Sequence, residues 1–137
     1  MRILFDTNVI IDAAIPSRTY HEVALELLAQ VDRGAISGLI APTSITTCWY
    51  VATTRHGVDP RPLFNTIEPL FELALMGRAA LRHALEIPEG ADFEDAYLAG
   101  AGAEAGAELV VTRNEDDFTD GPLRPYHPEQ LAAMLRG

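Results

Sequence analysis

Apolar and polar positions follow two different spacings along the chain. Short continuous apolar runs, which are typical of buried strands, occur at Met1–Phe5, Ser37–Ala41 and Glu108–Thr112, and Leu123–Tyr126 is a fourth candidate. Helical spacing, with cap residues at the ends, predicts helices at Val9–Ile15, Tyr20–Arg33, Pro42 to about Arg55, Arg78–Leu85, Asp92 to about Ala105, and Pro128–Leu135. Because strands alternate with helices, the pattern predicts an α/β fold with a mostly parallel sheet.

One region between the second and third predicted strands is less clear. A helical stretch begins at Pro60–Pro62 and is interrupted by Pro69. The next segment, Phe71–Leu75, is compatible with a strand or with a continuation of the helix.

The composition is that of one ordinary globular domain. The 137 residues are 48% hydrophobic and 22% charged, without a repeat, linker or low-complexity segment, so we predict a single domain over residues 1–137. No apolar run reaches the roughly 20 residues of a membrane span, and the N-terminus does not resemble a signal peptide. The single cysteine, Cys48, cannot form an internal disulfide. We therefore expect a cytoplasmic protein with no membrane association.

The charge narrows the possible functions. A formal net charge of −10 weighs against a simple nucleic-acid-binding protein, which normally has a basic face, but it is compatible with a metal-dependent nuclease. An acidic surface also suits a basic protein partner. All ten basic residues are arginines, whose guanidinium groups can bind phosphate through two hydrogen bonds.

Polar residues lie where predicted strands end and at the start of the helix predicted from Asp92 to about Ala105, which is rich in alanine. They are Asp6, Asp92, Asp95, Asn114, Asp116 and Asp117. In open α/β sheets, ligands bind beyond the carboxyl ends of the strands, so these segments are expected to converge at one edge. Clustered carboxylates repel one another unless a cation is present, and hard oxygen ligands suit Mg²⁺ or Mn²⁺.

Each acid also has a purely structural explanation. Asp6 and Asp92 are good helix N-caps, and Asp95 in the first turn of a helix is favoured by the helix dipole. Asp116 and Asp117 lie in a polar loop, where solvated acids are common. Their joint placement at strand ends, rather than any one of them, favours a site.

Three segments resemble the motifs of the PIN domain family. Asp6–Ile10 is similar to the opening D-T-N motif, Phe93–Ala96 to the E/D-D-A segment, and Val111–Phe118 to the closing T-R-N-x-x-D-F motif. Their order and spacing match over essentially the whole chain. The resemblance, in particular to VapC-type toxin ribonucleases, implies a three-layer fold with a central, mostly parallel sheet of four or five strands and helices on both faces. It also implies metal-dependent cleavage of RNA by a member of a toxin–antitoxin pair.

The resemblance assigns roles residue by residue. Asp6, Asp95 and Asp117 match the family's catalytic, metal-binding acids, with Mg²⁺ or Mn²⁺ as the expected cofactor. The supporting residues are expected to be Thr7, Asn8, Asp92, Thr112 and Asn114. Apart from the resemblance, substrate affinity must come from few basic residues, and the candidates for contact with the phosphates of RNA are Arg18, Arg55 and Arg113. Expected partners are RNA, a cognate antitoxin protein and a second copy of the chain in a homodimer.

The sequence departs from the family pattern at one position. The glutamate usual on the helix after the second strand aligns with Cys48, and no acid occurs between Asp32 and Asp59. We interpret Cys48 as a buried small hydrophobic residue, and Trp49 and Tyr50 as core or dimer-interface residues. Loss of the glutamate leaves two hypotheses open: a nuclease of reduced or specialised activity, or a PIN-like protein that binds RNA or protein without cutting.

Two other classes fit the sequence poorly. A phosphoacceptor domain of the response-regulator kind needs a late lysine, and the chain has no lysine. A Ser–His–acid hydrolase needs a serine in a nucleophile elbow, a context that Ser17, Ser37 and Ser44 lack.

Overall fold

A five-stranded, fully parallel sheet forms the middle layer of the molecule, with the strand order β3-β2-β1-β4-β5. The computed structural model describes all residues, 1–137. The strands are β1 (Arg2–Phe5), β2 (Ser37–Ile40), β3 (Glu72–Leu73), β4 (Leu109–Val111) and β5 (Arg124–Tyr126). β1 is central, because Leu4 lies between Leu39 of β2 and Val110 of β4. The predicted α/β fold with a parallel sheet is confirmed.

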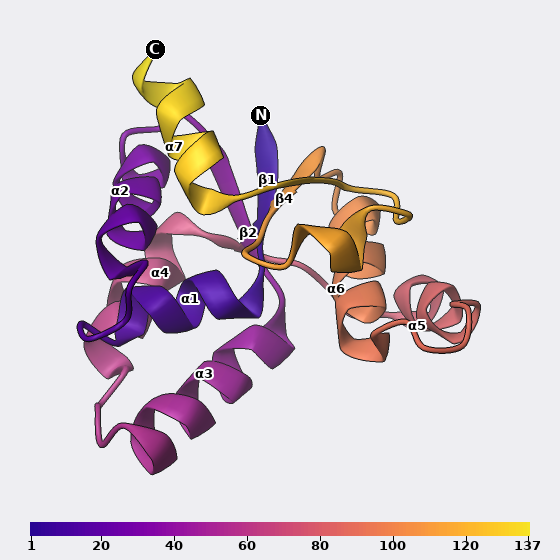
Figure 1. The fold of residues 1–137 in the computed structure, drawn as a ribbon, viewed down its shortest axis with the longest axis horizontal. Helices are drawn as coiled ribbons and strands as arrows, with labels where there is room; N and C mark the ends of the chain where they lie inside the picture. Colours follow the sequence, from indigo (N-terminus) through magenta and orange to yellow (C-terminus); the bar gives the residue numbers. More distant parts are fainter.

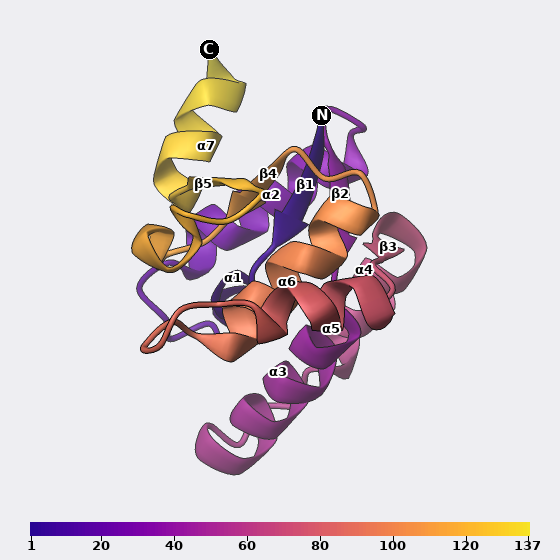
Figure 2. The ribbon, with the colours of Figure 1, turned by 90° about the vertical axis from the view of Figure 1, so that its right-hand side faces the viewer.

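Helices cover both faces of the sheet (Figure 1). One face carries α1 (Thr7–Ala14), α2 (His21–Asp32), α4 (Arg61–Leu70) and α7 (Pro128–Arg136). The other carries α6 (Phe93–Glu104), with α5 (Arg78–Leu85) packed on its outer side, in front of the sheet in Figure 2. The remaining helix, α3 (Pro42–Arg55), packs on α1 and extends away from the sheet. No helix combines the length and the apolar character that crossing a membrane requires.

Side-chain alternation along the central strand separates two hydrophobic cores. Ile3 and Phe5 point into the larger core beneath α1 and α2, whereas Leu4 points into the smaller core beneath α6. All three side chains are essentially inaccessible to solvent. This burial on both faces explains why the strand sequence is continuously apolar rather than alternating.

Glycines allow α6 to lie close to its neighbours. A Cβ atom at Gly102 would lie 3.0 Å from Leu4 Cδ2 on β1, and one at Gly100 would lie 3.1 Å from Ala80 Cα on α5. The second contact is with backbone, which has little room to move. This close packing sets the start of α6 beside the carboxyl ends of β1 and β4.

The structure differs from the sequence-based expectation in three places. α1 begins at Thr7 rather than Val9, because Asp6 caps it. α4 continues through Pro69 to Leu70, and the ambiguous segment after it forms the two-residue strand β3. A short 3₁₀ helix, η1 (Glu115–Phe118), follows β4 and was not predicted.

Candidate active site

Asp6 sits at the carboxyl end of β1 and is only 3% exposed. Its Oδ1 accepts a hydrogen bond from the Thr7 backbone N–H at 2.8 Å, and its Oδ2 accepts one from the Thr112 hydroxyl at 2.8 Å. Burial raises the pKa of Asp6 to about 6, even though both hydrogen bonds favour the charged form. The side chain is thus fixed in place by β1, α1 and the end of β4 together.

Asp92 and Asp95 open α6 on the opposite side of the same edge. Asp92 is the N-cap, and its carboxylate accepts a hydrogen bond from the Asp95 backbone N–H at 2.9 Å. Burial raises the pKa of Asp95 to about 8, and the nearby carboxyl groups of Asp6, Asp92 and Asp117 add to this increase. These acids therefore lie close enough to Asp95 to disfavour its ionisation.

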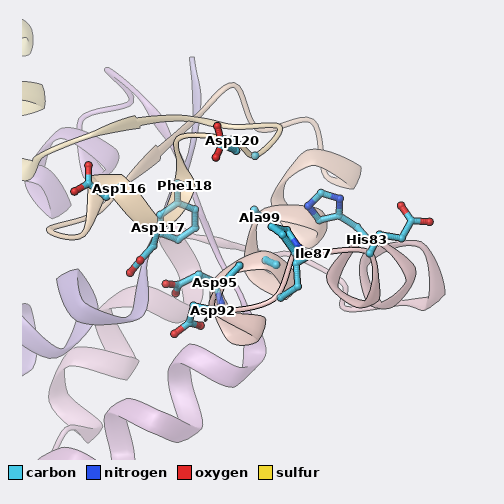
Figure 3. A pocket seen from close by; sticks show the side chains of 15 residues that line it. His83, Ile87, Asp92, Asp95, Ala99, Asp116, Asp117, Phe118 and Asp120 are labelled. Carbon is cyan, nitrogen blue, oxygen red and sulfur yellow. Dashed lines mark hydrogen bonds between the residues drawn. The ribbon is translucent and has the colours of Figure 1, made fainter.

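Asp117 comes from η1, directly after the end of β4. The turn is closed by the Asn114 N–H, which donates to the Thr112 hydroxyl oxygen at 2.9 Å, and by the Asp117 N–H, which donates to the Asn114 carbonyl at 3.0 Å. Asp117 and Asp95 also share a side-chain hydrogen bond that helps raise the pKa of Asp95. Figure 3 shows their side chains, with that of Asp92, on one side of a pocket.

The pocket beside these acids has a volume of about 670 Å³ and opens between α5, α6 and η1. Its acidic lining residues are Glu86, Asp92, Asp95, Asp116, Asp117 and Asp120. His83 is the basic group on its far side (Figure 3). Asp6 does not line this pocket and is buried at the carboxyl end of β1.

The donor set suits a hard divalent cation. Asp6, Asp95 and Asp117 supply carboxylate oxygens, the ligands that Mg²⁺ and Mn²⁺ prefer. The raised pKa values of Asp6 and Asp95, caused mainly by burial, indicate that charging these two groups is unfavourable unless a cation is bound. As the side chains stand, no three acidic, histidine or cysteine groups are arranged to ligate a single ion. Binding an ion would therefore require side-chain adjustment around the fixed Asp6.

The family model described as PIN domain matches residues 2–116. The chain belongs to the PIN domain family. The crystal structure of VapBC2 from Rickettsia felis, bound to a DNA fragment from their promoter, contains a similar chain: the TM-score is 0.60 at 17% identity, over 93% of this chain and 98% of that one. No curated protein matches this chain. The three-layer PIN fold expected from the motifs is confirmed.

Two residues predicted to orient Asp6, Thr7 and Asn8, also make contacts with other parts of the chain. Thr7 holds Asp6 through its backbone, while its hydroxyl hydrogen-bonds that of Ser44 on α3 at 2.7 Å. The side-chain Oδ1 of Asn8 accepts a hydrogen bond from the Arg113 backbone N–H at 3.4 Å. Both residues link the first motif to other segments.

In PIN domains the helix that corresponds to α3 usually carries a glutamate. In this chain α3 makes its polar contact with the site through Ser44. Cys48 is fully buried, and its thiol faces the Ile10 carbonyl, inside the core between α1 and α3. Burial raises the pKa of this thiol to about 11, which fits a neutral core side chain. Trp49 and Tyr50 are 42% and 56% exposed, so of the two expected places the core is wrong, and a dimer interface stays a prediction.

The arginines chosen as phosphate ligands are arranged unequally. Arg18 and Arg113 both bind the buried carboxylate of Asp12 on α1. Arg55 is exposed in the last turn of α3, roughly 16 Å along the helix from Ser44 at 1.5 Å per residue. The structure thus brings Arg113 next to the site through its sequence neighbours Thr112 and Asn114, but not Arg55.

Three residues near the site were missed from the sequence. Glu94 lies near enough to Asp6 to help raise its pKa, and it is part of the acidic pair in the second motif. Ser44 gave no distinguishing signal. Asp12 did: an acid among Ile10, Ile11 and Ala13 in an apolar helix points to a buried charge with a partner.

Replacing Cys48 with alanine is expected to leave activity within about twofold of the wild type, because the thiol faces the core and not the carboxylates. It should lower the free energy of unfolding by about 1 kcal/mol, since only one buried heavy atom is lost. Urea denaturation and RNA cleavage would measure the two effects. Ser44→Ala is the matched comparison on the same helix, and it should lower cleavage more than Cys48→Ala does.

Proposed function

We propose that this PIN domain is a metal-dependent endoribonuclease that hydrolyses RNA phosphodiester bonds. One observation carries the proposal: the motifs bring the buried Asp6, the half-buried Asp95 and the exposed Asp117 from three distant segments to one edge of the sheet. A purely structural role for these acids would not explain why Asp117 lies close enough to both Asp6 and Asp95 to add to the effect of burial on their pKa values. Such a gathering of carboxyl groups with raised pKa values is typical of sites built for a cation or for catalysis.

The chemistry follows from the residues and the cation they suit. When bound, Mg²⁺ or Mn²⁺ supplies a Lewis acid that polarises a phosphate oxygen and activates water. Asp6 offers a fixed carboxylate, because Thr7 and Thr112 hold its two oxygens. Burial raises the pKa of Asp95, and the group must be deprotonated to become a ligand, so metal binding competes with its protonation. Asp117 lies beside it and completes the set of acids.

Binding of RNA must overcome the net charge of −10. The side chains of Arg18 and Arg113 are partly exposed, with 30% and 26% accessible, and these two arginines are the phosphate contacts of this proposal. Affinity that depends on such contacts should decrease steeply as salt is raised.

The physiological role in this proposal is that of a toxin with a cognate antitoxin. Support comes from the family and from the shared fold with the chain in the Rickettsia felis VapBC2 complex. The acidic surface of this chain suits a basic partner segment. Homodimer formation and a cytoplasmic location belong to the same proposal.

The direct test is cleavage of a labelled RNA by purified protein with Mg²⁺, with Mn²⁺ and with a chelator. We expect products bearing a 5′ phosphate when either ion is present, no cleavage in the chelator, and recovery when Mn²⁺ is restored. Calorimetric titration of each ion would run in parallel. Metal binding with intact RNA under all conditions would contradict the nuclease and favour the alternative of a non-cutting binding protein.

A further inference from the structure

A second buried acid, Asp12, lies on α1 outside the carboxylate site and is 1% exposed. Its Oδ1 accepts a hydrogen bond from Arg18 Nε at 3.0 Å, and its Oδ2 accepts one from Arg113 Nε at 2.7 Å. Arg113 Nη2 also donates to Oδ1, at 3.4 Å. Two cations therefore converge on a single carboxylate that has almost no contact with water.

The two arginines come from different parts of the chain. Arg18 lies in the loop between α1 and α2, and Arg113 lies between β4 and η1. The same region is closed by His21, whose Nδ1 lies 2.8 Å from the Asp12 carbonyl oxygen, and by Tyr20, whose ring lies 5.5 Å from the Arg113 guanidinium carbon. Asp12 is thus the common anchor of α1, the loop after it, and the loop after β4.

Arg113 is placed between two residues that shape the candidate active site. Thr112, before it, donates its hydroxyl hydrogen to Asp6 Oδ2. Asn114, after it, donates to Thr112 and accepts the N–H of Asp117. A shift of Arg113 would therefore move the group that fixes Asp6 and the turn that presents Asp117.

We propose that Asp12 is a positioning residue for the nuclease site. It holds Arg113 so that the β4–η1 loop keeps Thr112 against Asp6 and Asp117 against Asp95. This inference rests on the function proposed above. The burial of Asp12 supports it, because desolvating a charge makes a buried ion pair a poor source of stability, while its directional hydrogen bonds fix geometry.

The decisive variant is Asp12→Asn, which keeps the shape of the side chain. It removes the charge and places an amide N–H₂ group opposite one of the two arginines. Because both groups are hydrogen-bond donors, that hydrogen bond is lost. We expect kcat for RNA cleavage to decrease about tenfold, the lower end of losses when residues that orient metal ligands are replaced. KM should change less, because Arg18 and Arg113 are still present.

Non-additivity separates positioning from general destabilisation. If Asp12 acts through Arg113, the double variant with Arg113→Gln should have a kcat close to that of the worse single variant. Glu26→Gln, which breaks an exposed ion pair with Arg136 far from the site, is the matched control and should cleave like the wild type. The proposal would be contradicted if the losses in kcat of the two single variants added up in the double variant. It would also be contradicted if the unfolded fraction of Asp12→Asn accounted for its whole loss in kcat. Should Asp12→Asn not fold, Arg113→Lys, which cannot make the same forked contact, takes its place.

Amide hydrogen exchange gives a second readout that does not depend on cleavage. In Asp12→Asn, the N–H groups of Asn114 and Asp117 should exchange faster, while those of β1 should not change. Unchanged exchange in the loop would overturn the role of Asp12 even in an active enzyme. A wild type that does not cut RNA would overturn the proposed function alone, since the exchange result still decides whether Asp12 holds the loop.

Discussion

Cleavage of RNA by the Asp6→Asn variant is expected to decrease to the background of the assay, a loss of at least about 100-fold. Replacing groups that only orient metal ligands already costs about 10- to 100-fold in metal affinity or activity, and Asp6 is proposed as a ligand itself. Asp6 is the one acid of the proposed set that directly follows the central strand, where Thr7 and Thr112 hold its two carboxylate oxygens. Cleavage assays and calorimetric titration with Mg²⁺ and Mn²⁺ measure the two losses.

This variant should remain folded, which makes the result easy to interpret. Asparagine is as good an N-cap as aspartate and can still accept the hydrogen bond from the Thr7 N–H. It also removes a charge whose burial is unfavourable. Asp32→Asn, at the exposed end of α2, changes the net charge equally and should cleave like the wild type. Equal cleavage by the Asp6 variant would contradict the assignment of the site.

The layer structure was predictable because the strands are buried on both faces. β1, β2 and β4 read as continuous apolar runs, and parallel strands with intervening helices follow from that pattern. The edge of the sheet was harder, since β3 is a two-residue strand whose side chains are both exposed. Its strand character comes from pairing with β2, a tertiary contact that local sequence does not encode.

The principal acids of the candidate site could be found from sequence because they occupy strand ends and a helix cap, positions that turn chemistry marks. The sequence does not show where the side chains of a helix point, because this depends on how the helix packs against its neighbours. Ser44 and Cys48 are four residues apart on α3, and only the packing of α3 against α1 shows that Ser44 meets Thr7 while Cys48 meets the core. The arginines posed the same difficulty, since their partner Asp12 lies far from Arg113 in sequence.

The thermal stability of the metal-free protein is expected to decrease as the pH rises from about 5 to about 8. Asp6 and Asp95 have pKa values raised to about 6 and about 8, so each holds its proton more tightly in the folded state than in the unfolded state. The stability that protonation provides is therefore complete below their ordinary pKa of 3.8 and is lost as the pH passes the raised values. For the nearly fully buried Asp6, this corresponds to a free-energy cost on the order of 3 kcal/mol for the charged form.

A bound cation should reverse this dependence, because it binds only the deprotonated acids. We expect Mg²⁺ or Mn²⁺ to raise Tm little near pH 5 and most near pH 8. At 100 times its Kd, the ion should increase the free energy of unfolding by about 2.7 kcal/mol. Scanning calorimetry across this pH range, with and without ion, measures both effects. Asp95→Asn removes one of the two titrating groups, so its metal-free Tm should depend less on pH and its gain from the ion should be smaller. A wild-type Tm that rises with pH in the chelator, or an Asp95→Asn variant with an unchanged slope, would show that these acids do not form the coupled site described here.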